Sequence, residues 1–521
     1  MGIPGAMRAR IALPCLALAL ACGGGEEAPA EEESAPSAGD LAEAALPETA
    51  TPEERAAARL DAEYPKHGAV TGIQLRVHTE PNEEATVVGW LRIGSRVRLA
   101  DETRRGGGCE GSWHRLHPTG WVCADDGLEV RDEAPEIEAP TDEGWKNDQV
   151  EEAAARGALV LPPPAQLEQT MPYDYWYVKE STVPEYHRLP SRNEQRAALA
   201  KAARYRDLLE IDERRAQLYL SGERDDGPPG TAVTARYLDR GFYVASNGRE
   251  VRAFRHFVRT TQGRYIKKAQ LEERSGHDFE GVELGGETGR TLPVAWTIRT
   301  SRPLILEERE GEDGATSVSW VDDEEAEAIE RQTLLEGWQE RRNIGGRIMH
   351  VIETEAGTRY LRSWFASVAE AVERPEEVAE DEPWIHIDLS EQTLVMYRGD
   401  EPIFATLVST GVEEHETPTG LFEIRRKHVT DTMANIGPDA GDDRYRIEDV
   451  PWTQYFEGSI ALHTAFWHTR FGLPRSHGCV NMTPHDAHFV FGRTWPELPE
   501  GWHGLSTDQT EFRGSHVLVT D

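Results

Sequence analysis

The chain has 521 residues, of which 93 are acidic and 56 are lysine or arginine, so its formal net charge is −37 at pH 7. A charge of this sign and size repels nucleic acid and anionic membrane surfaces, and we expect no nucleic-acid partner. The length predicts several domains.

The N-terminal residues predict export. Residues 1–21 combine a basic start, a short apolar run and small residues at the end, which is typical of a signal peptide and too short for a transmembrane helix. Ala19-Leu20-Ala21 fits a cleavage site that would release a soluble periplasmic protein. Ala21-Cys22-Gly23 instead resembles a bacterial lipoprotein site, with Cys22 lipidated. We favour the lipid anchor at Cys22, which would be the chain's only attachment to a membrane.

Residues 22–63 are rich in Glu, Ala and Pro, and acidic residues far outnumber basic ones. Such a segment cannot bury enough apolar surface to offset the entropy lost on ordering. We therefore expect a disordered acidic tether.

The segment 64–131 predicts a small β domain. Short runs alternate apolar and polar residues, from Leu75-Arg76-Val77 near the start to Gly120-Trp121-Val122 near the end. The pattern resembles the SH3-like barrels of exported bacterial enzymes, which bind cell-wall peptide or act as spacers. Cys109 and Cys123 both lie in it, and in an oxidising compartment we expect them to form a disulfide. Two free buried thiols are the alternative.

Acid-rich segments at 132–170 and 376–382 are expected to be linkers, and they bound a middle region of residues 171–375. The whole chain is predicted to be mainly β with a few helices, in several domains.

The middle region gives mixed signals. A run without Gly or Pro predicts a helix over 192–219, and a charged run predicts a second helix over 322–339. Residues 232–272 and 292–372 repeat the pattern that closes the first β domain. They are interpreted either as degenerate relatives of that domain or as unrelated hairpins.

The C-terminal domain, residues 383–521, is predicted to be rich in strands. Helix 484–491, with Thr483 as its N-cap, is its one clear helix. The expected strands are 385–397, 404–409, 422–427, 459–462 and 517–519. Cys479 would lie on the loop just before the helix, where the partial positive charge of the helix end helps to hold a thiolate.

The run Ser476-His477-Gly478-Cys479-Val480-Asn481 follows His463 by a short spacer. A free thiol, with a pKa of about 8.5, needs a neighbouring base or dipole to ionise at neutral pH. Gly478 lets the backbone approach a reacting carbonyl, and the N–H groups of Gly478 and Cys479 are candidate donors to an oxyanion. The alternative is a buried structural cysteine near unrelated histidines.

This run, together with Trp384–Leu394, Val408–Gly411 and Thr417–Ile424, resembles the L,D-transpeptidases of bacterial peptidoglycan synthesis. The resemblance covers about residues 383–521. It implies that Cys479 attacks the diaminopimelate carbonyl of a peptidoglycan stem peptide, releases D-alanine and leaves a thioester that an acceptor amine resolves. It implies no cofactor.

The resemblance also assigns roles. His463 is expected to be the general base and acid, oriented by a backbone carbonyl near Thr464, while His477 and Gly478 belong to the oxyanion loop. His477 as the base is the alternative. The residues expected to contact the substrate are Tyr455, Trp467, Arg475, Ser476 and Asn481. No metal is expected, because the spacing of the other histidines, His468, His485 and His488, matches no metal site.

Two other functions stay open. The protein would be an L,D-carboxypeptidase if water resolved the thioester, or a wall-binding lipoprotein if its catalytic domain were inactive. The acceptor is not specified by the sequence: a diaminopimelate side chain, a lysine of an envelope protein or a free D-amino acid all fit.

Overall fold

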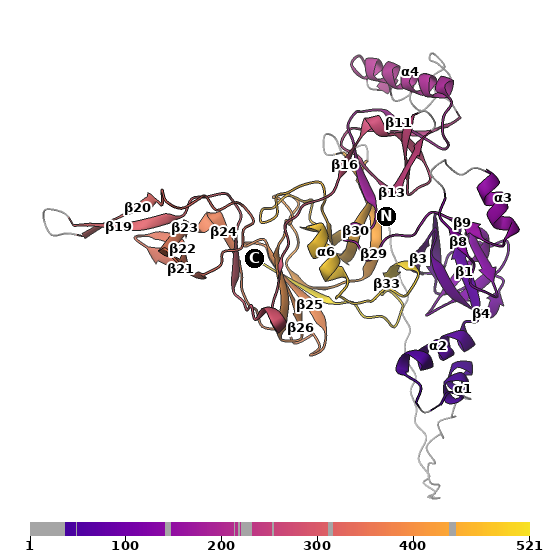
Figure 1. Ribbon diagram of the computed structural model, residues 1–521, viewed down its shortest axis with the longest axis horizontal. Helices are drawn as coiled ribbons and strands as arrows, with labels where there is room; N and C mark the ends of the chain where they lie inside the picture. Colours follow the sequence, from indigo (N-terminus) through magenta and orange to yellow (C-terminus); the bar gives the residue numbers. More distant parts are fainter. Residues whose placement is uncertain are drawn as a thin grey trace, which may run out of the picture. The chain divides into compact units, whose positions relative to one another are not determined.

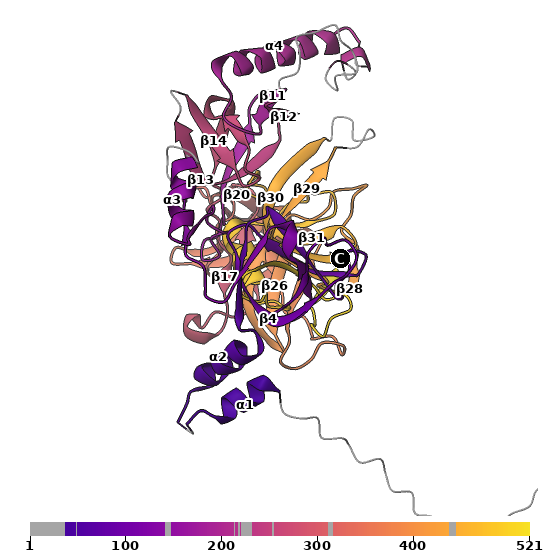
Figure 2. The ribbon, with the colours of Figure 1, turned by 90° about the vertical axis from the view of Figure 1, so that its right-hand side faces the viewer.

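The computed structural model describes residues 37–47, 49–140, 147–212, 214–216, 219, 232–252, 255–310, 316–436 and 444–521 (Figures 1 and 2). The chain divides into a unit of residues 1–63 and a larger unit of residues 64–521. Strands far outnumber helices, which confirms the predicted mainly β fold. No helix within the described ranges is long and apolar enough to cross a membrane.

The smaller unit corrects the prediction of a disordered tether over 22–63. Helices α1 (Ala38–Ala44) and α2 (Pro52–Glu63) occupy much of that segment. Ser37 and Asp40 form a capping box at the start of α1, and the alanines of α2 favour a helix intrinsically. The predicted signal peptide and Cys22 lie outside the described residues.

Residues 66–131 form an antiparallel unit that we call the first β unit. Its first strand pairs with its fourth and seventh, its second with its third and sixth, and its fifth with its fourth and sixth. A disulfide joins Cys109 to Cys123, with 5.8 Å between their Cα atoms. The strands are β1 (Lys66–Val70), β2 (Gln74–His78), β3 (Val87–Arg92), β4 (Arg96–Arg104), β5 (Trp113–Leu116), β6 (Trp121–Cys123) and β7 (Leu128–Arg131). The SH3-like assignment of this unit stays a prediction.

The first predicted linker, 132–170, contains short elements of its own: β8 (Ile137–Glu138), α3 (Asn147–Ala155) and β9 (Leu159–Val160). Strands β8 and β9 pair in parallel.

Residues 174–274, the second β unit, repeat the pairing scheme of the first β unit strand for strand. A 3-10 helix again precedes the last strand, as in the first unit. The strands are β10 (Asp174–Val178), β11 (Val183–Tyr186), β12 (Thr234–Leu238), β13 (Tyr243–Arg252), β14 (His256–Thr260), β15 (Tyr265–Lys267) and β16 (Leu271–Arg274). The unit therefore begins well before the predicted residue 232, because helix α4 (Arg192–Leu209) is inserted between β11 and β12.

Residues 294–369, the third β unit, keep most of the same scheme but form two sheets, β18–β24 and β20-β19-β23-β22-β21. A 3-10 helix of residues 363–365 again precedes the last strand. The strands are β18 (Val294–Thr297), β19 (Leu304–Glu310), β20 (Thr316–Asp322), β21 (Trp338–Ile344), β22 (Arg347–Thr354), β23 (Gly357–Arg362) and β24 (Ala366–Ala369).

Two helix predictions in the middle region need correction. Helix α4 begins at Arg192 as predicted but ends at Leu209. The segment 322–339 is not helical. It is mostly turns, tied to neighbouring chain by isolated bridges from Leu334 to Trp296 and from Ile329 to Ser301, and the N–H of Leu335 donates to the carbonyl of Ala295 over 2.8 Å. Pairing with a neighbouring strand outweighs the weak intrinsic preference of a charged segment for helix.

The C-terminal region is built from two sheets and helix α6 (Pro484–Phe491), whose N-cap is Thr483 as predicted. One sheet has the order β17-β27-β26-β25-β34-β28, and its edge strand β17 (Val282–Glu283) comes from the middle region. The remaining members of this sheet are β25 (Pro383–Asp388), β26 (Thr393–Arg398), β27 (Glu401–Leu407), β28 (Gly420–Glu423) and β34 (His516–Thr520). The other sheet contains β29 (Arg426–Asn435), β30 (Tyr445–Glu457), β31 (Ile460–Thr464), β32 (Val480–Met482) and β33 (Trp502–Ser506).

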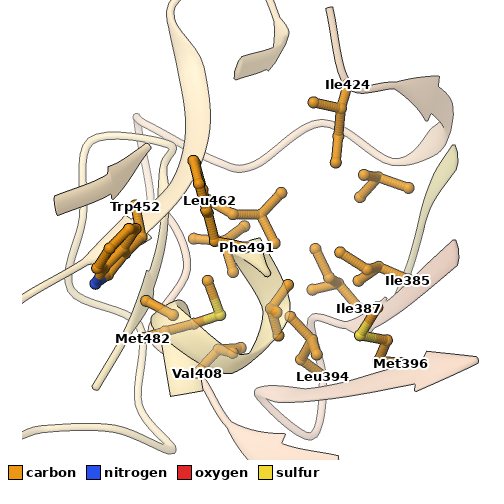
Figure 3. Close-up of a cluster of buried hydrophobic side chains, with 14 of the residues drawn as sticks. Ile385, Ile387, Leu394, Met396, Val408, Ile424, Trp452, Leu462, Met482 and Phe491 are labelled. Carbon is orange, nitrogen blue, oxygen red and sulfur yellow. The ribbon is translucent and has the colours of Figure 1, made fainter. Parts of the chain in front are cut away.

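A buried apolar cluster holds the two sheets and α6 together (Figure 3). In the figure Phe491 of α6 lies near Leu462 of β31, and Ile385, Ile387 and Leu394 lie on the other sheet. This packing fixes β31, which carries His463, and β32, which Cys479 directly precedes.

The first two β units are joined to this region by strand pairing. Strand β3 pairs with β33, and β13 pairs with β30. At Gly89 of β3 a side chain would collide with Trp502, since a Cβ atom there would lie 2.0 Å from its ring. Arg92 of β3 also forms a buried ion pair with Asp449 of β30, with Nη1 and Oδ1 2.7 Å apart.

Candidate active site

The backbone brings His463 and Cys479 to the same edge of a sheet. Strands β31 and β32 are parallel, with Leu462 opposite Val480 and His463 opposite Asn481. Opposite residues in neighbouring strands point to the same face, and side chains alternate along a strand. His463 and Asn481 therefore share a face, and Cys479, two residues before Asn481, is placed toward it.

The turn before β32 is held by Ser476. The Ser476 hydroxyl accepts a hydrogen bond from the N–H of Gly478 (3.1 Å) and donates to the carbonyl of Cys479 (2.5 Å). Thr417 donates to the carbonyl of Gly478 over 2.8 Å. Gly478 has φ of +108°, which only glycine adopts readily.

These hydrogen bonds bear on two expectations. The N–H of Gly478 is used inside the turn, so this group is not the oxyanion donor predicted from the sequence. The hydroxyl of Ser476, expected to contact substrate, is likewise used to shape the turn that presents Cys479.

His463 is poised as a base. Its Nδ1 lies 2.9 Å from the carbonyl of Thr464, which can only accept, so Nδ1 carries the ring proton and Nε2 keeps its lone pair. This is the orienting carbonyl expected from the sequence. Burial lowers the pKa of His463 to about 4, and the hydrogen bond to Thr464 only partly opposes that shift. The ring is therefore uncharged at neutral pH.

Cys479 is a thiol at neutral pH. Burial raises the pKa of its side chain, and a backbone hydrogen bond at Ala461 opposes the shift only in part. Strand β32 separates Cys479 from the N-terminus of α6, so the predicted help from the helix end is wrong. A neutral thiol beside a neutral imidazole requires proton transfer to His463 when the sulfur attacks.

Both residues line one cavity of about 630 Å³. Its described lining contains no acidic side chain, and Arg475 is its one arginine or lysine. The lining comprises Gly241, Tyr243, Thr432, Met433, Ala434, Tyr445, Ile447, Tyr455, Ser459, His463, Trp467, His468, Arg475, Ser476, His477, Cys479 and Asn481. In a chain of net charge −37 this lining suits an anionic ligand.

Every residue expected to contact substrate lines this cavity. Trp467 stacks on His463, with ring centroids 5.7 Å apart, and so fixes the plane of the imidazole. Tyr455 donates its hydroxyl proton to Asp431 over 2.8 Å. Arg475 is exposed at the rim.

Asn481 and His477 occupy different surroundings within the lining. The buried amide of Asn481 lies 2.9 Å from Nε2 of His468. His477 is exposed and faces His415 and Tyr445, with ring centroids 4.7 and 6.0 Å away.

The remaining histidines each have another partner. His485 contacts Asp486 (3.2 Å), and His488 contacts the carbonyl of Leu167 (2.9 Å). Within the described ranges the one group of three metal-type ligands contains Cys109 and Cys123, whose sulfurs form the disulfide.

Sequence reasoning missed part of the lining. Thr432, Met433 and Ala434 lie on β29, and Tyr445 and Ile447 lie on β30. Gly241 and Tyr243 come from the second β unit, more than 200 residues before Cys479. No local pattern could have connected that turn with the cysteine.

A cysteine and an uncharged histidine that line one cavity are the groups that thiol-dependent acyl transfer requires. Residues 382–497 match the family model of the L,D-transpeptidase catalytic domain (YkuD), and this part of the chain is an L,D-transpeptidase catalytic domain.

Several solved structures are similar to part of the chain. A cysteine-to-serine mutant of the Enterococcus faecium L,D-transpeptidase is 20% identical over 27% of this chain and 50% of its own, with a TM-score of 0.21. An L,D-transpeptidase from Stackebrandtia nassauensis is 25% identical over 28% of this chain and 58% of its own, with a TM-score of 0.20. An L,D-transpeptidase from Mycobacterium smegmatis is 17% identical over 42% of this chain and 77% of its own, with a TM-score of 0.22. The chain thus spans about half the length of the first two. No curated protein matches the chain.

Proposed function

We propose that the protein is an L,D-transpeptidase that acts on peptidoglycan stem peptides through a thioester at Cys479. The observation that carries the proposal is one cavity containing Cys479, the uncharged base His463 and the single cation Arg475. Stem peptides bear several carboxylates, which suits a cavity lined by a guanidinium and no described acid.

The proposed reaction uses these groups in turn. Sγ of Cys479 bonds to the diaminopimelate carbonyl carbon while Nε2 of His463 accepts the thiol proton. The carbon–nitrogen bond to D-alanine then breaks, and the leaving amine takes the proton from His463. We assign the oxyanion to the N–H of Cys479, because the N–H of Gly478 is already engaged.

An acceptor amine completes the cycle. Its nitrogen attacks the thioester carbon, the carbon–sulfur bond breaks, and the amine proton returns through His463 to the sulfur. The new bond joins an L-centre to a D-centre. If water attacks instead, the product is the shortened stem of an L,D-carboxypeptidase.

A single incubation tests the proposal. The purified full chain is mixed with stem tetrapeptide as the donor. Separate reactions also receive one acceptor each: a second tetrapeptide, a lysine peptide or a free D-amino acid. The products are identified by mass spectrometry. We expect a cross-linked product from at least one acceptor and a thioester adduct on the enzyme. Cys479→Ala is the control and should give neither.

The other outcomes identify the alternatives. Tripeptide alone would make the protein a carboxypeptidase. Unchanged peptide with no adduct would refute catalysis and leave a wall-binding protein. Product formed equally by Cys479→Ala would refute the assignment of the nucleophile.

This activity would place the protein in the cell envelope, and we propose that a lipid on Cys22 anchors it there in the periplasm. Cys22→Ala should shift the protein from the membrane fraction to the soluble fraction. An unchanged distribution would refute the anchor.

A further inference from the structure

One wall of the catalytic cavity is supplied from outside the catalytic domain. Gly241 and Tyr243 of the second β unit line it together with Tyr445 and Ile447 of β30. The wall is continuous, because Tyr243 of β13 pairs in parallel with Ile447.

Buried polar contacts hold the second β unit against β30. Arg236 of β12 bonds to Glu185 (2.6 Å) in its own unit and also to Glu448 of β30, and both carboxylates are fully buried. The hydroxyl of Tyr175 donates to the carbonyl of Asp449 over 2.6 Å. An ion pair in such surroundings is costly to break, so the position of Tyr243 is well fixed.

The ring of Tyr243 contacts His463, the proposed base, through one intervening ring. It packs against Phe466 and Trp467, with ring centroids 5.6 and 6.3 Å away. Trp467 in turn stacks on His463 at 5.7 Å. A substrate bound in the cavity near His463 therefore meets a surface that includes Tyr243.

Tyr243 shares the cavity lining with Arg475, the one arginine or lysine of that lining. Burial raises the pKa of the Tyr243 hydroxyl, so this group keeps its proton at neutral pH and is available as a hydrogen-bond donor.

We propose that Tyr243 is a specificity-determining residue of this active site, whose hydroxyl donates a hydrogen bond to a carboxylate of the peptidyl donor beside the guanidinium of Arg475. The inference rests on the proposed function, since it takes a peptidoglycan stem as the donor. The two residues joined at the reacting amide each carry one free carboxylate: the one on the D-centre of diaminopimelate and the one of the terminal D-alanine. Both have the same chemistry, and the test separates them.

The test compares the full-length wild type with Tyr243→Phe, which removes the hydroxyl and keeps the ring contacts. Three donors are used: stem tetrapeptide, the same peptide amidated at the diaminopimelate D-centre, and the peptide amidated at its C-terminus. The half-saturating donor concentration and the maximal rate of Cys479 acylation are measured by rapid quenching and intact-mass analysis.

We expect Tyr243→Phe to raise the half-saturating concentration of the unmodified donor about tenfold, as for one hydrogen bond to a charged group, and to change the maximal rate less than about twofold. Toward the donor that lacks the recognised carboxylate, wild type and variant should bind alike.

Tyr237→Phe is the matched control. Tyr237 lies in β12 of the same unit and donates to the carbonyl of Ala198 over 3.3 Å, outside the cavity lining. Its variant should acylate like the wild type. An equal effect of Tyr237→Phe would show that the second β unit had merely loosened, and would overturn the proposal.

The remaining outcomes separate the two levels of inference. Acylation of the wild type with no change in Tyr243→Phe, for any of the three donors, overturns the carboxylate contact and leaves the proposed function intact. No adduct on the wild type with any donor overturns both.

Discussion

Replacing His463 by alanine should make acylation of Cys479 strongly dependent on pH. Burial places the pKa of the thiol above its ordinary value of 9.0, so at pH 7 at most about one thiol in a hundred is ionised. Without a base the reaction can use only that fraction. We therefore expect a loss of at least about 100-fold at pH 7, and a recovery of about tenfold for each pH unit toward pH 9.

The wild type should behave differently. A base whose pKa is lowered to about 4 is in its active, uncharged form above that pH and loses it as the pH falls through 4. Its acylation rate should thus vary little between pH 6 and pH 9. The family resemblance predicts that a carbapenem acylates the thiolate, so the adduct can be timed by intact mass across this range.

A matched variant and two possible results test whether His463 accepts the thiol proton and has a low pKa. His485→Ala removes another histidine, one that lies outside the cavity lining, and should keep the wild-type profile. An equal loss at pH 7 and pH 9 in His463→Ala would show that this residue does more than accept a proton. A wild-type rate that falls tenfold per unit below pH 7 would refute the low pKa of His463.

Three further predictions concern the nucleophile and stability. Cys479→Ala should keep the wild-type melting temperature and form no carbapenem adduct. If the variant gained the same adduct mass as the wild type, another residue would be the nucleophile. Arg92→Met should lower the free energy of unfolding by about 3–5 kcal/mol at pH 7, because it leaves Asp449 buried without its partner. Burial raises the pKa of Asp449, but Arg92 and hydrogen bonds outweigh this and hold it low. The ion pair therefore stabilises the wild type at neutral pH, and this stabilisation is lost as the pH falls below the ordinary carboxyl pKa. In the variant burial raises the pKa of Asp449, so the difference in unfolding free energy between wild type and variant should be smallest in acid. Denaturant titrations that give a difference below about 1 kcal/mol at pH 7, or the same difference at every pH, would contradict this. Replacing Cys109 and Cys123 by alanine should cost about 3 kcal/mol, since their bond spans 14 residues, and should leave the acylation rate unchanged; a shift in that rate would refute their independence from the site.

Local signals in the sequence predicted local structure well. Helix α6 and its cap at Thr483 followed from the capping preference and the apolar run, and both bounds agree with the structure. The carbonyl that orients His463 was also expected, because a residue beside it on the same strand can reach the ring. The grouping of the predicted contact residues followed from their position in one short segment.

Features that depend on distant partners could not be predicted. The charged run before Trp338 is typical of a helix, but in the structure it forms turns tied by bridges to Trp296 and Ser301, which are distant in sequence. The hydrogen bond of Gly478 depends on the rotamer of Ser476, which composition does not specify. Tyr243 reaches the cavity because an entire β unit packs on β30.

The shared strand scheme of the three β units has an evolutionary consequence. The first and second units keep the same six strand pairings although α4 interrupts the second. Internal duplication of an ancestral segment explains this most simply, since pairing order survives sequence drift better than residue identity does. After such a duplication, one copy can retain its original role while another acquires a new neighbour. In this chain Gly241 and Tyr243 of the second unit line the cavity that contains Cys479, so mutations in a segment that carries no catalytic motif can change which ligands fit that cavity.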